Sequence, residues 1–190
     1  MGIIETLEKW DKALFLILNG SHNSFFDFLM PWISNKYVWI PLYAALLYWL
    51  IKTDRSKTLY ILVSLGLLIF ISDQLASGFL KPTVERLRPC YDLEIKDQVH
   101  LLKGCGGKFG FASSHASNSF GIAFFCWLML RKNYKHIWLL LPWAAIIAYS
   151  RVYLGVHFPG DVIMGALIGL GAAFLVKYLF DKASIIQLRT

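Results

Sequence analysis

Charged residues are scarce in this chain. Asp, Glu, Lys and Arg make up 16% of its 190 residues, whereas 57% are apolar. The scarcity of charge leaves five long apolar runs, Tyr37–Ile51, Thr58–Leu80, Ala116–Leu130, Ile137–Tyr149 and Val162–Phe180. A soluble domain of this length could bury a core, but it would not show this succession of runs. The pattern therefore argues against a soluble globular protein.

Cysteine is also rare, with three residues in all. No Cys or His cluster has the spacing of metal ligands, so the sequence predicts no metal site and no cofactor. Cys126 lies inside an apolar run and is interpreted as a packing residue. Cys90 and Cys105 share the polar segment 81–112, where an oxidising exterior would permit a disulfide. Two free thiols are the alternative.

Repeats, linkers and low-complexity segments are absent, which predicts one domain over residues 1–190. The N-terminus has no basic start followed by an uninterrupted apolar core, so we expect no cleaved signal peptide. In segment 1–35, apolar residues recur at helical spacing at Ile3, Leu7, Trp10 and Leu14. This spacing predicts an interfacial amphipathic helix. The short run Phe25–Ile33 would be a second interfacial or re-entrant piece, and a sixth spanning helix is the alternative.

The five apolar runs predict membrane helices. Several hold only about 15 uninterrupted apolar residues, fewer than the roughly 20 that cross the hydrocarbon. In series, with Trp and Tyr near their ends and basic residues just beyond, they nevertheless fit spanning helices whose missing turns are polar. We therefore expect an all-α, integral-membrane helical bundle with about five spanning helices plus the N-terminal interfacial helix.

Basic residues give the expected orientation. With five spans, one face carries Lys52, Arg55, Lys57, Arg131, Lys132, Lys135, Lys177, Lys182 and Arg189. The positive-inside rule makes that face cytoplasmic and places the loop 81–112 outside. The net charge of +7 is then explained by membrane topology and by an anion-binding site. No basic helix interleaved with exposed aromatics suggests a nucleic-acid partner.

Three polar islands stand at the ends of the apolar runs. They are Lys81-Pro-Thr-Val-Glu-Arg-Leu-Arg88-Pro89, Ala112-Ser-Ser-His115 and Ser150-Arg-Val-Tyr-Leu-Gly-Val-His157-Phe-Pro-Gly-Asp161. Together they supply cations that can hold a phosphate and two imidazoles that can attack it and protonate what leaves. Ser113 suits the N-cap of the following helix, where free amides also bind anions.

In order and spacing, the islands resemble the signature of the type 2 phosphatidic acid phosphatase superfamily. That signature runs Lys, six residues, Arg-Pro; then Pro-Ser-Gly-His; then Ser-Arg, five residues, His, three residues, Asp. The first and third islands match at every defining position. The second departs from it, with Ala112 for Pro and Ser114 for Gly. The matched span, 81–161, covers under half of the chain.

The resemblance assigns roles to the matched residues. His157 would be the nucleophile that forms a phosphohistidine, and His115 the acid that protonates the leaving alcohol. Asp161, four residues after His157, can accept the second imidazole N–H and fix the tautomer; capping its own helix is a compatible role. The phosphate ligands would be Lys81, Arg88, Ser113, Ser114 and Arg151.

Two further residues are possible secondary site members. Asp73 lies inside the second run, where a carboxylate is costly and usually functional. Its helical spacing to Lys81 fits a supporting pair, and a neutral hydrogen-bonded Asp is the alternative. Arg86 would make a secondary phosphate or headgroup contact. The glycines of 104–110 either form turns or cradle phosphate through their amides.

The sequence thus predicts a metal-independent lipid phosphatase whose partner is a phosphorylated membrane lipid in the bilayer. The candidate substrates are undecaprenyl pyrophosphate, phosphatidylglycerophosphate, phosphatidic acid and lipid A phosphates. A phosphotransferase using the same site and a non-catalytic scaffold or transporter are the alternatives; a related haloperoxidase would be soluble. The location expected is a bacterial inner membrane with an external site. The sequence does not indicate an oligomeric state.

Overall fold

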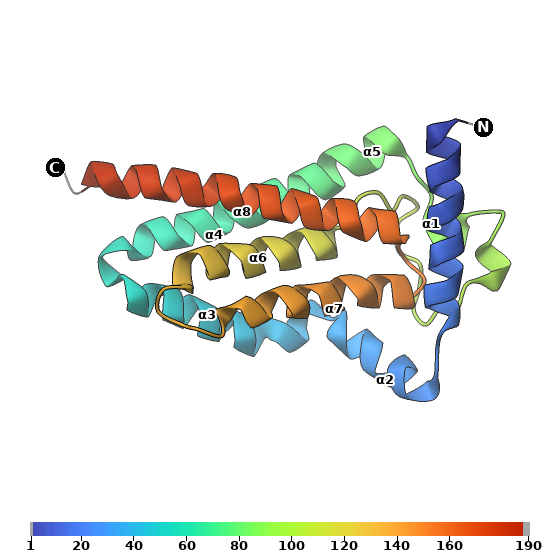
Figure 1. Cartoon of the computed structure of the whole chain (residues 1–190), viewed down its shortest axis with the longest axis horizontal. Helices are drawn as coiled ribbons and strands as arrows, with labels where there is room; N and C mark the ends of the chain where they lie inside the picture. Colours follow the sequence, from blue (N-terminus) through green and yellow to red (C-terminus); the bar gives the residue numbers. More distant parts are fainter. Residues whose placement is uncertain (1, 188–190) are drawn as a thin grey trace.

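Five long helices lie side by side in a bundle (Figure 1). The computed structural model describes residues 2–187. The bundle helices are α3 (Ile40–Thr53), α4 (Thr58–Asp73), α6 (Ser114–Leu130), α7 (Leu140–Tyr153) and α8 (Pro159–Gln187). Each corresponds to one of the five apolar runs. The all-α prediction is confirmed, since the described residues form no strand and only one isolated β-bridge.

The second run is longer than α4 because the helix continues without a break. A π-helical segment, η3 (Gln74–Leu80), and a short helix, α5 (Lys81–Val84), extend it to the first polar island. Two helical stretches, Arg55–Val84 and Pro159–Ile185, are long and apolar enough to cross a membrane. The apolar helix Ile137–Tyr153 is shorter. Short 3₁₀ turns connect the elements at Lys36–Trp39, Arg55–Lys57, Pro89–Tyr91, Lys96–Gln98 and Ile137–Leu139.

Helix α6 is the centre of the bundle and packs against α3, α4, α7 and α8. Its contact with α8 is close because α8 has glycine at Gly165 and Gly169. A Cβ at these positions would lie 2.4 Å from the Ser113 carbonyl and 2.1 Å from the Ser117 carbonyl. Small residues four apart permit such backbone approach between membrane helices. This contact fixes the start of α6 against the start of α8.

The outer surface of the bundle is apolar. Large exposed side chains on α4 and α8 include Leu59, Phe70, Leu167 and Phe174. In water an apolar surface of this extent would be an association or membrane site. It fits a protein whose helices face lipid.

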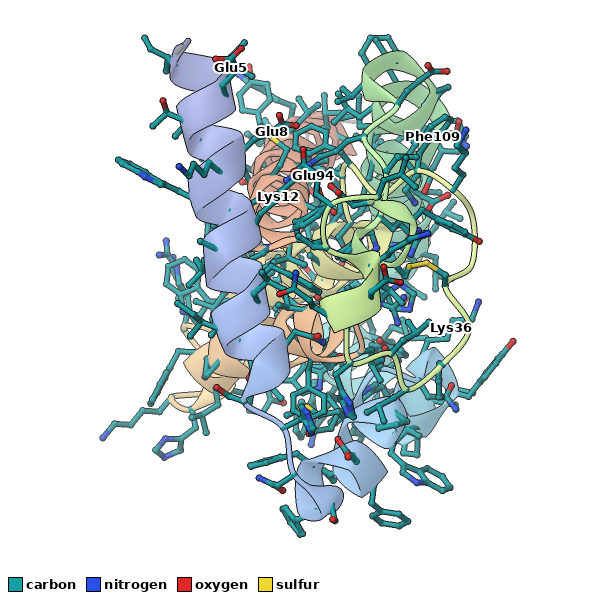
Figure 2. All side chains as sticks on the ribbon, turned by 90° about the vertical axis from the view of Figure 1, so that its right-hand side faces the viewer. Glu5, Glu8, Lys12, Lys36, Glu94 and Phe109 are labelled. Carbon is teal, nitrogen blue, oxygen red and sulfur yellow. A yellow bond between two sulfur atoms is a disulfide. The ribbon has the colours of Figure 1, made fainter. Side chains whose placement is uncertain are left out.

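The N-terminal helix α1 (Ile3–Gly20) runs across one end of the bundle instead of parallel to it (Figure 1). Leu7 and Trp10 are 56% and 67% exposed, as expected of a helix whose apolar side meets the membrane interface. Lys12 forms ion pairs of 2.8 Å with Asp92 and 2.6 Å with Glu94, which join α1 to the loop 81–112 (Figure 2). The second short run forms α2 (Ser24–Ile33).

Candidate active site

All three polar islands meet at the end of the bundle that α1 crosses (Figure 1). At least one hydrogen bond joins each pair of islands. Lys81 Nζ donates to Ser114 Oγ at 3.3 Å, and Arg88 Nη1 donates to the Val156 carbonyl at 3.3 Å. The Ser113 amide donates to the Asp161 carbonyl at 2.9 Å. The fold therefore brings together residues that lie up to 80 positions apart in the matched span 81–161.

His157 and Asp161 form the most buried part of the site. Their side chains are 2% and 0% exposed, and His157 Nδ1 lies 3.2 Å from Asp161 Oδ2. The same oxygen accepts the Phe158 amide at 3.0 Å, so Asp161 both orients the imidazole and caps α8. Since Nδ1 is engaged by the carboxylate, Nε2 is the nitrogen available for attack.

Burial also determines the charge of His157. Removal from water disfavours the imidazolium and lowers the pKa of His157 to about 4, although the bond to Asp161 acts in the opposite direction. The ring is therefore neutral near pH 7. A neutral imidazole is the form that can act as a nucleophile.

Three cations belong to this site, Lys81, Arg88 and Arg151, and Arg88 and Arg151 lie close enough to His157 to disfavour its charged form. Within residues 2–187, no ion pair shorter than 4.0 Å involves Lys81, Arg88 or Arg151. Arg151 donates from Nη1 to the Ser34 hydroxyl, while its buried Nε has no partner among the described residues. Unneutralised cations in a buried site are suited to binding a phosphate.

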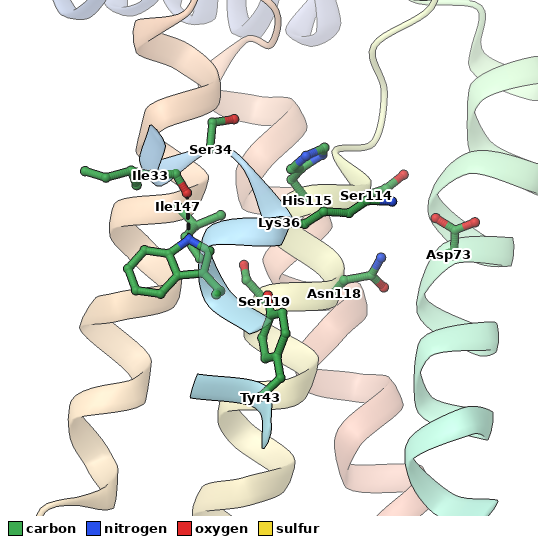
Figure 3. A pocket seen from close by; sticks show the side chains of 11 residues that line it. Ile33, Ser34, Lys36, Tyr43, Asp73, Ser114, His115, Asn118, Ser119 and Ile147 are labelled. Atoms are coloured by element: carbon green, nitrogen blue, oxygen red, sulfur yellow. Dashed lines mark hydrogen bonds between the residues drawn. The ribbon is translucent and has the colours of Figure 1, made fainter. Parts of the chain in front are cut away.

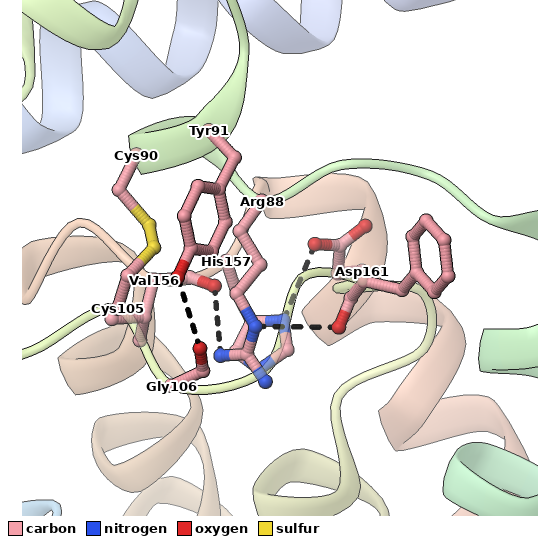
Figure 4. The surroundings of a disulfide bond; sticks show 9 residues. Arg88, Cys90, Tyr91, Cys105, Gly106, Val156, His157 and Asp161 are labelled. Atoms are coloured by element: carbon pink, nitrogen blue, oxygen red, sulfur yellow. Dashed lines mark hydrogen bonds and ion pairs between the residues drawn. A yellow bond between two sulfur atoms is a disulfide. The ribbon is translucent and has the colours of Figure 1, made fainter.

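The loop 81–112 holds Arg88 in place. Its Nε donates to the Phe109 carbonyl at 3.3 Å, and its amide donates to the Lys108 carbonyl at 3.2 Å. A disulfide between Cys90 and Cys105 closes the same loop beside Arg88 (Figure 4). Of the two alternatives for these cysteines, the structure thus contains the bridged one.

Glycine at the end of this loop allows a close approach. A Cβ at Gly110 would lie 2.8 Å from Asp161 Oδ2 and 3.3 Å from Arg88 Cγ. Any larger side chain would push the loop away from the His157–Asp161 pair. At Gly110, the glycine therefore serves close packing against catalytic candidates.

The second island begins α6 as expected. The Ser113 side chain accepts the Ala116 amide at 3.5 Å and is the N-cap. Ser114 Oγ hydrogen-bonds with Ser77 and lies beside Lys81, although this position departs from the family signature. His115 lies on the first turn of α6 and lines a cavity of about 200 Å³.

The contacts of the Arg86 side chain differ from those predicted. Its Nη1 donates to Asp161 Oδ1 at 3.0 Å and its Nη2 to Asp11 Oδ2 at 2.7 Å. Its guanidinium also stacks 4.2 Å from the centre of the Phe158 ring. Because both Nη groups are engaged by carboxylates, Arg86 supports Asp161 instead of facing a phosphate.

The expected pair between Asp73 and Lys81 is also absent from the described ion pairs. Lys81 Nζ instead donates to Ser77 Oγ at 3.0 Å and to Ser114. The reason is the π-helical segment Gln74–Leu80, which changes the helical register between the two residues. Asp73 lines the cavity beside His115.

Several residues of the site have no signal in the sequence. Asp11 of α1 reaches Arg86 and accepts the Gly160 amide at 2.8 Å. Ser34 binds Arg151, and Asn118 lines the cavity beside His115. Asp11 looks like an ordinary polar position of an amphipathic helix, and only the fold shows that this position faces the site.

One group of side chains in residues 2–187 has the composition of a metal site. The ligand atoms of His22, Asp27 and His100 lie within 4.8 Å of one another. Sequence spacing did not indicate this group because its members come from separate segments. The group shares no residue with the three islands. It joins α2 to the loop 81–112, and Tyr153 of α7 donates to Asp27 at 2.7 Å.

Fold and site together define a membrane helical bundle. Its site combines a buried histidine–carboxylate pair with basic side chains that form no ion pair among the described residues. The chain belongs to the PAP2 superfamily, whose family model matches residues 57–185. It is therefore a lipid phosphatase of this family, as the predicted resemblance implied.

Named relatives agree with this assignment. The chain is 41% identical to the lipid A 4'-phosphatase of Bacteroides thetaiotaomicron over 95% of this chain and 81% of the relative. It is 35% identical to the lipid A 4'-phosphatase of Porphyromonas gingivalis, over 95% and 78%. The crystal structure of Aquifex aeolicus LpxE matches with a TM-score of 0.68 and 29% identity, over 87% of this chain and 93% of that one.

Proposed function

We propose that this enzyme hydrolyses a phosphate monoester or pyrophosphate of a membrane lipid, with His157 as the nucleophile. The observation that carries the proposal is the set of three cations, free of carboxylates, around a neutral histidine that a buried aspartate orients. Lys81, Arg88 and Arg151 are the ligands for the phosphate oxygens. At the start of α6, Ser113 contributes its hydroxyl group, and Ser114 contributes its amide and hydroxyl groups.

In the first step, His157 Nε2 forms a bond to phosphorus while the bond from phosphorus to the leaving oxygen breaks. His115 donates a proton to that oxygen, so the lipid departs as a neutral alcohol or, from a pyrophosphate, as a protonated phosphate. Asp161 stabilises the positive charge that the substituted imidazole acquires. The cations stabilise the negative charge that spreads over the phosphoryl oxygens.

In the second step, water attacks the phosphohistidine. His115, now neutral, accepts a proton from the water, the phosphorus–nitrogen bond breaks and inorganic phosphate leaves. Both histidines return to their starting states. The protein's own cations perform the neutralisation that divalent ions provide elsewhere, so hydrolysis is expected to continue in excess EDTA.

A lipid substrate is supported by the cavities next to His115. The polar cavity adjoins an apolar one of about 340 Å³, and Lys36, Tyr43 and Asn118 line both. The apolar cavity continues between α3, α4 and α6 along side chains such as Leu46 and Ile69. An alkyl chain held there would anchor the substrate while its phosphate reaches the site, which supplies proximity.

Among the candidate lipids, a lipid A phosphate is the first to test, because the two lipid A 4'-phosphatases match 95% of this chain. An undecaprenyl-diphosphatase of Sulfolobus acidocaldarius is also similar, at 30% identity over 87% of this chain. Undecaprenyl pyrophosphate, phosphatidylglycerophosphate and phosphatidic acid therefore complete the panel. We place the site on the external face, opposite the basic end of the bundle.

The test is phosphate release by purified enzyme from this panel in mixed micelles, with a soluble sugar phosphate for comparison. Anchored lipids are expected to be preferred over the soluble ester, with and without EDTA. Equal catalytic efficiency on the sugar phosphate and every lipid would refute a lipid enzyme. Strict dependence on added Mg²⁺ or Zn²⁺ would refute the metal-independent chemistry.

A further inference from the structure

Figure 3 shows the polar cavity beside His115, whose lining residues include Asp73 and Asn118. It has a volume of about 200 Å³ and lies between α3, α4, α6 and α7. Asp73 projects into it from α4, and Asn118 lies one turn of α6 beyond His115. The matching residues of the family signature do not include Asp73 or Asn118.

Asp73 is a carboxylate within a membrane-spanning stretch, Arg55–Val84. Ionisable groups at such positions are costly and ordinarily have a partner. Within residues 2–187, no hydrogen bond or ion pair reaches the Asp73 side chain, and Lys81 is bonded to Ser77 and Ser114. The carboxylate therefore faces the cavity as an acceptor for whatever enters it.

Asn118 shows the same lack of a partner at one atom. Its Oδ1 is buried and accepts no hydrogen bond from the described residues. A buried polar atom without a partner costs roughly 1–3 kcal/mol. The buried Asn118 Oδ1 and the half-buried Asp73 carboxylate line one cavity, and together they indicate that a ligand with donor groups completes the hydrogen bonding.

The place of the cavity identifies which part of the substrate reaches it. In the proposed function, His115 protonates the leaving oxygen, so the atoms attached to that oxygen lie next to His115. About 200 Å³ corresponds to roughly seven water volumes. That space fits a polyol or part of a sugar ring, while acyl chains would continue into the adjoining apolar cavity.

We propose that Asp73 and Asn118 select the leaving group, favouring lipid phosphates whose alcohol carries further hydroxyl or amide N–H donors. A sugar or polyol headgroup has such donors. A polyprenyl diphosphate leaves as a phosphate, which supplies few donors and brings negative charge towards the Asp73 carboxylate. Lys36, which also lines the cavity, is exposed and takes part in none of the described ion pairs.

This inference rests on the proposed function, and one comparison tests it. Phosphate release is measured on an acylated glucosamine 4-phosphate and on a polyprenyl diphosphate, and the ratio of the two kcat/KM values is compared between proteins. The wild type is expected to favour the amino-sugar lipid. Asp73→Asn is expected to lower that ratio about tenfold or more, because a hydrogen bond to a charged acceptor is lost. Asp181→Asn, an exposed aspartate on α8, is the matched control and should leave the ratio unchanged.

Asn118→Leu is the second variant, which keeps the inference testable if Asp73→Asn does not fold. It should lower the same ratio by a smaller factor, since a neutral acceptor is lost. A ratio unchanged in every folded variant would overturn the leaving-group assignment while the proposed function stands. A wild-type preference for the diphosphate would also overturn it. No phosphate release from either lipid by the wild type would instead refute the proposed function.

Discussion

The pair of His157 and Asp161 was predictable because its geometry is local. Four residues separate the two side chains, and Pro159 between them favours the first turn of a helix. The structure has the resulting contact at 3.2 Å. The same holds for Ser113, whose N-cap role follows from its place before an apolar run. At these positions the sequence alone specified which atoms meet.

Arg86 and Asp73 show where prediction from single residues fails. Arg86 was expected to bind phosphate because it lies between Lys81 and Arg88. Its partner Asp11 is 75 positions away on a helix that crosses the end of the bundle, and no spacing rule gives that contact. The register of Asp73 depends on a π-helical segment, which has no strong signal in sequence.

The ionisation of His157 leads to the first prediction. The pKa of about 4 in the folded protein lies below the ordinary value of roughly 6.5 expected in the unfolded chain. The folded state therefore binds a proton at His157 less readily than the unfolded chain does. The contribution of His157 to the free energy of unfolding is complete above about pH 6.5 and is lost as the pH falls towards 4. NMR titration of histidine-labelled protein measures this directly, with His157→Gln to assign the signal. A midpoint near 6.5 for His157 would contradict the burial argument.

At the scale of elements, the five apolar runs gave the bundle because membrane helices need long apolar segments. The ends differ by a few residues, as at α8, which begins at Pro159 instead of Val162 and continues past Phe180 to Gln187. The interfacial helix was also predictable from its periodicity. Its function was not, because the contacts of Asp11 with the site and of Lys12 with the loop 81–112 depend on how α1 packs against the bundle.

Asp11 leads to the second prediction, a positioning role for α1. Asp11→Asn weakens the 2.7 Å contact with Arg86, and Arg86 in turn holds Asp161. We expect kcat to fall about tenfold with little change in KM, because a charge-assisted bond behind the orienting aspartate is lost. Glu8→Gln on the same helix is the control. A rise in KM at constant kcat would indicate that α1 contributes only to substrate binding.

The loop 81–112 leads to the third prediction. The disulfide between Cys90 and Cys105 closes a loop of about 15 residues, which stabilises a fold by about 3 kcal/mol in the chain-entropy description. Cys90→Ser should therefore lower the melting temperature and also weaken phosphate binding, since the loop holds Arg88. Intact mass after thiol alkylation, with and without reductant, establishes whether the bridge exists. Two alkylatable loop thiols in freshly isolated protein would exclude it.

At the scale of the whole molecule, the bundle has two chemically different ends. The basic residues near Lys52, Arg131 and Lys177 lie towards one end of the bundle, and the three islands lie at the opposite end. The sequence predicted this polarity because each run must reverse direction in the membrane. It could not predict the cavities next to His115, which form between side chains of helices far apart in the chain.

The fourth prediction concerns orientation in the membrane. Single cysteines at Lys96 and Asn133, in a background without the native cysteines, report on opposite ends of the bundle. We expect an impermeant thiol reagent to label position 96 in intact cells and position 133 only after permeabilisation. The reverse pattern would place the active site on the cytoplasmic face.

The central claim is that His157 performs the attack on a lipid phosphate. Phosphate release by His157→Gln, measured on the preferred lipid beside the wild type and the distant control His136→Gln, tests it most directly. Both variants should keep the wild-type melting behaviour within a few degrees, since glutamine preserves a hydrogen-bond donor towards Asp161. The proposed mechanism predicts no release above background from His157→Gln and normal release from His136→Gln. Near-normal release from a folded His157→Gln would contradict it.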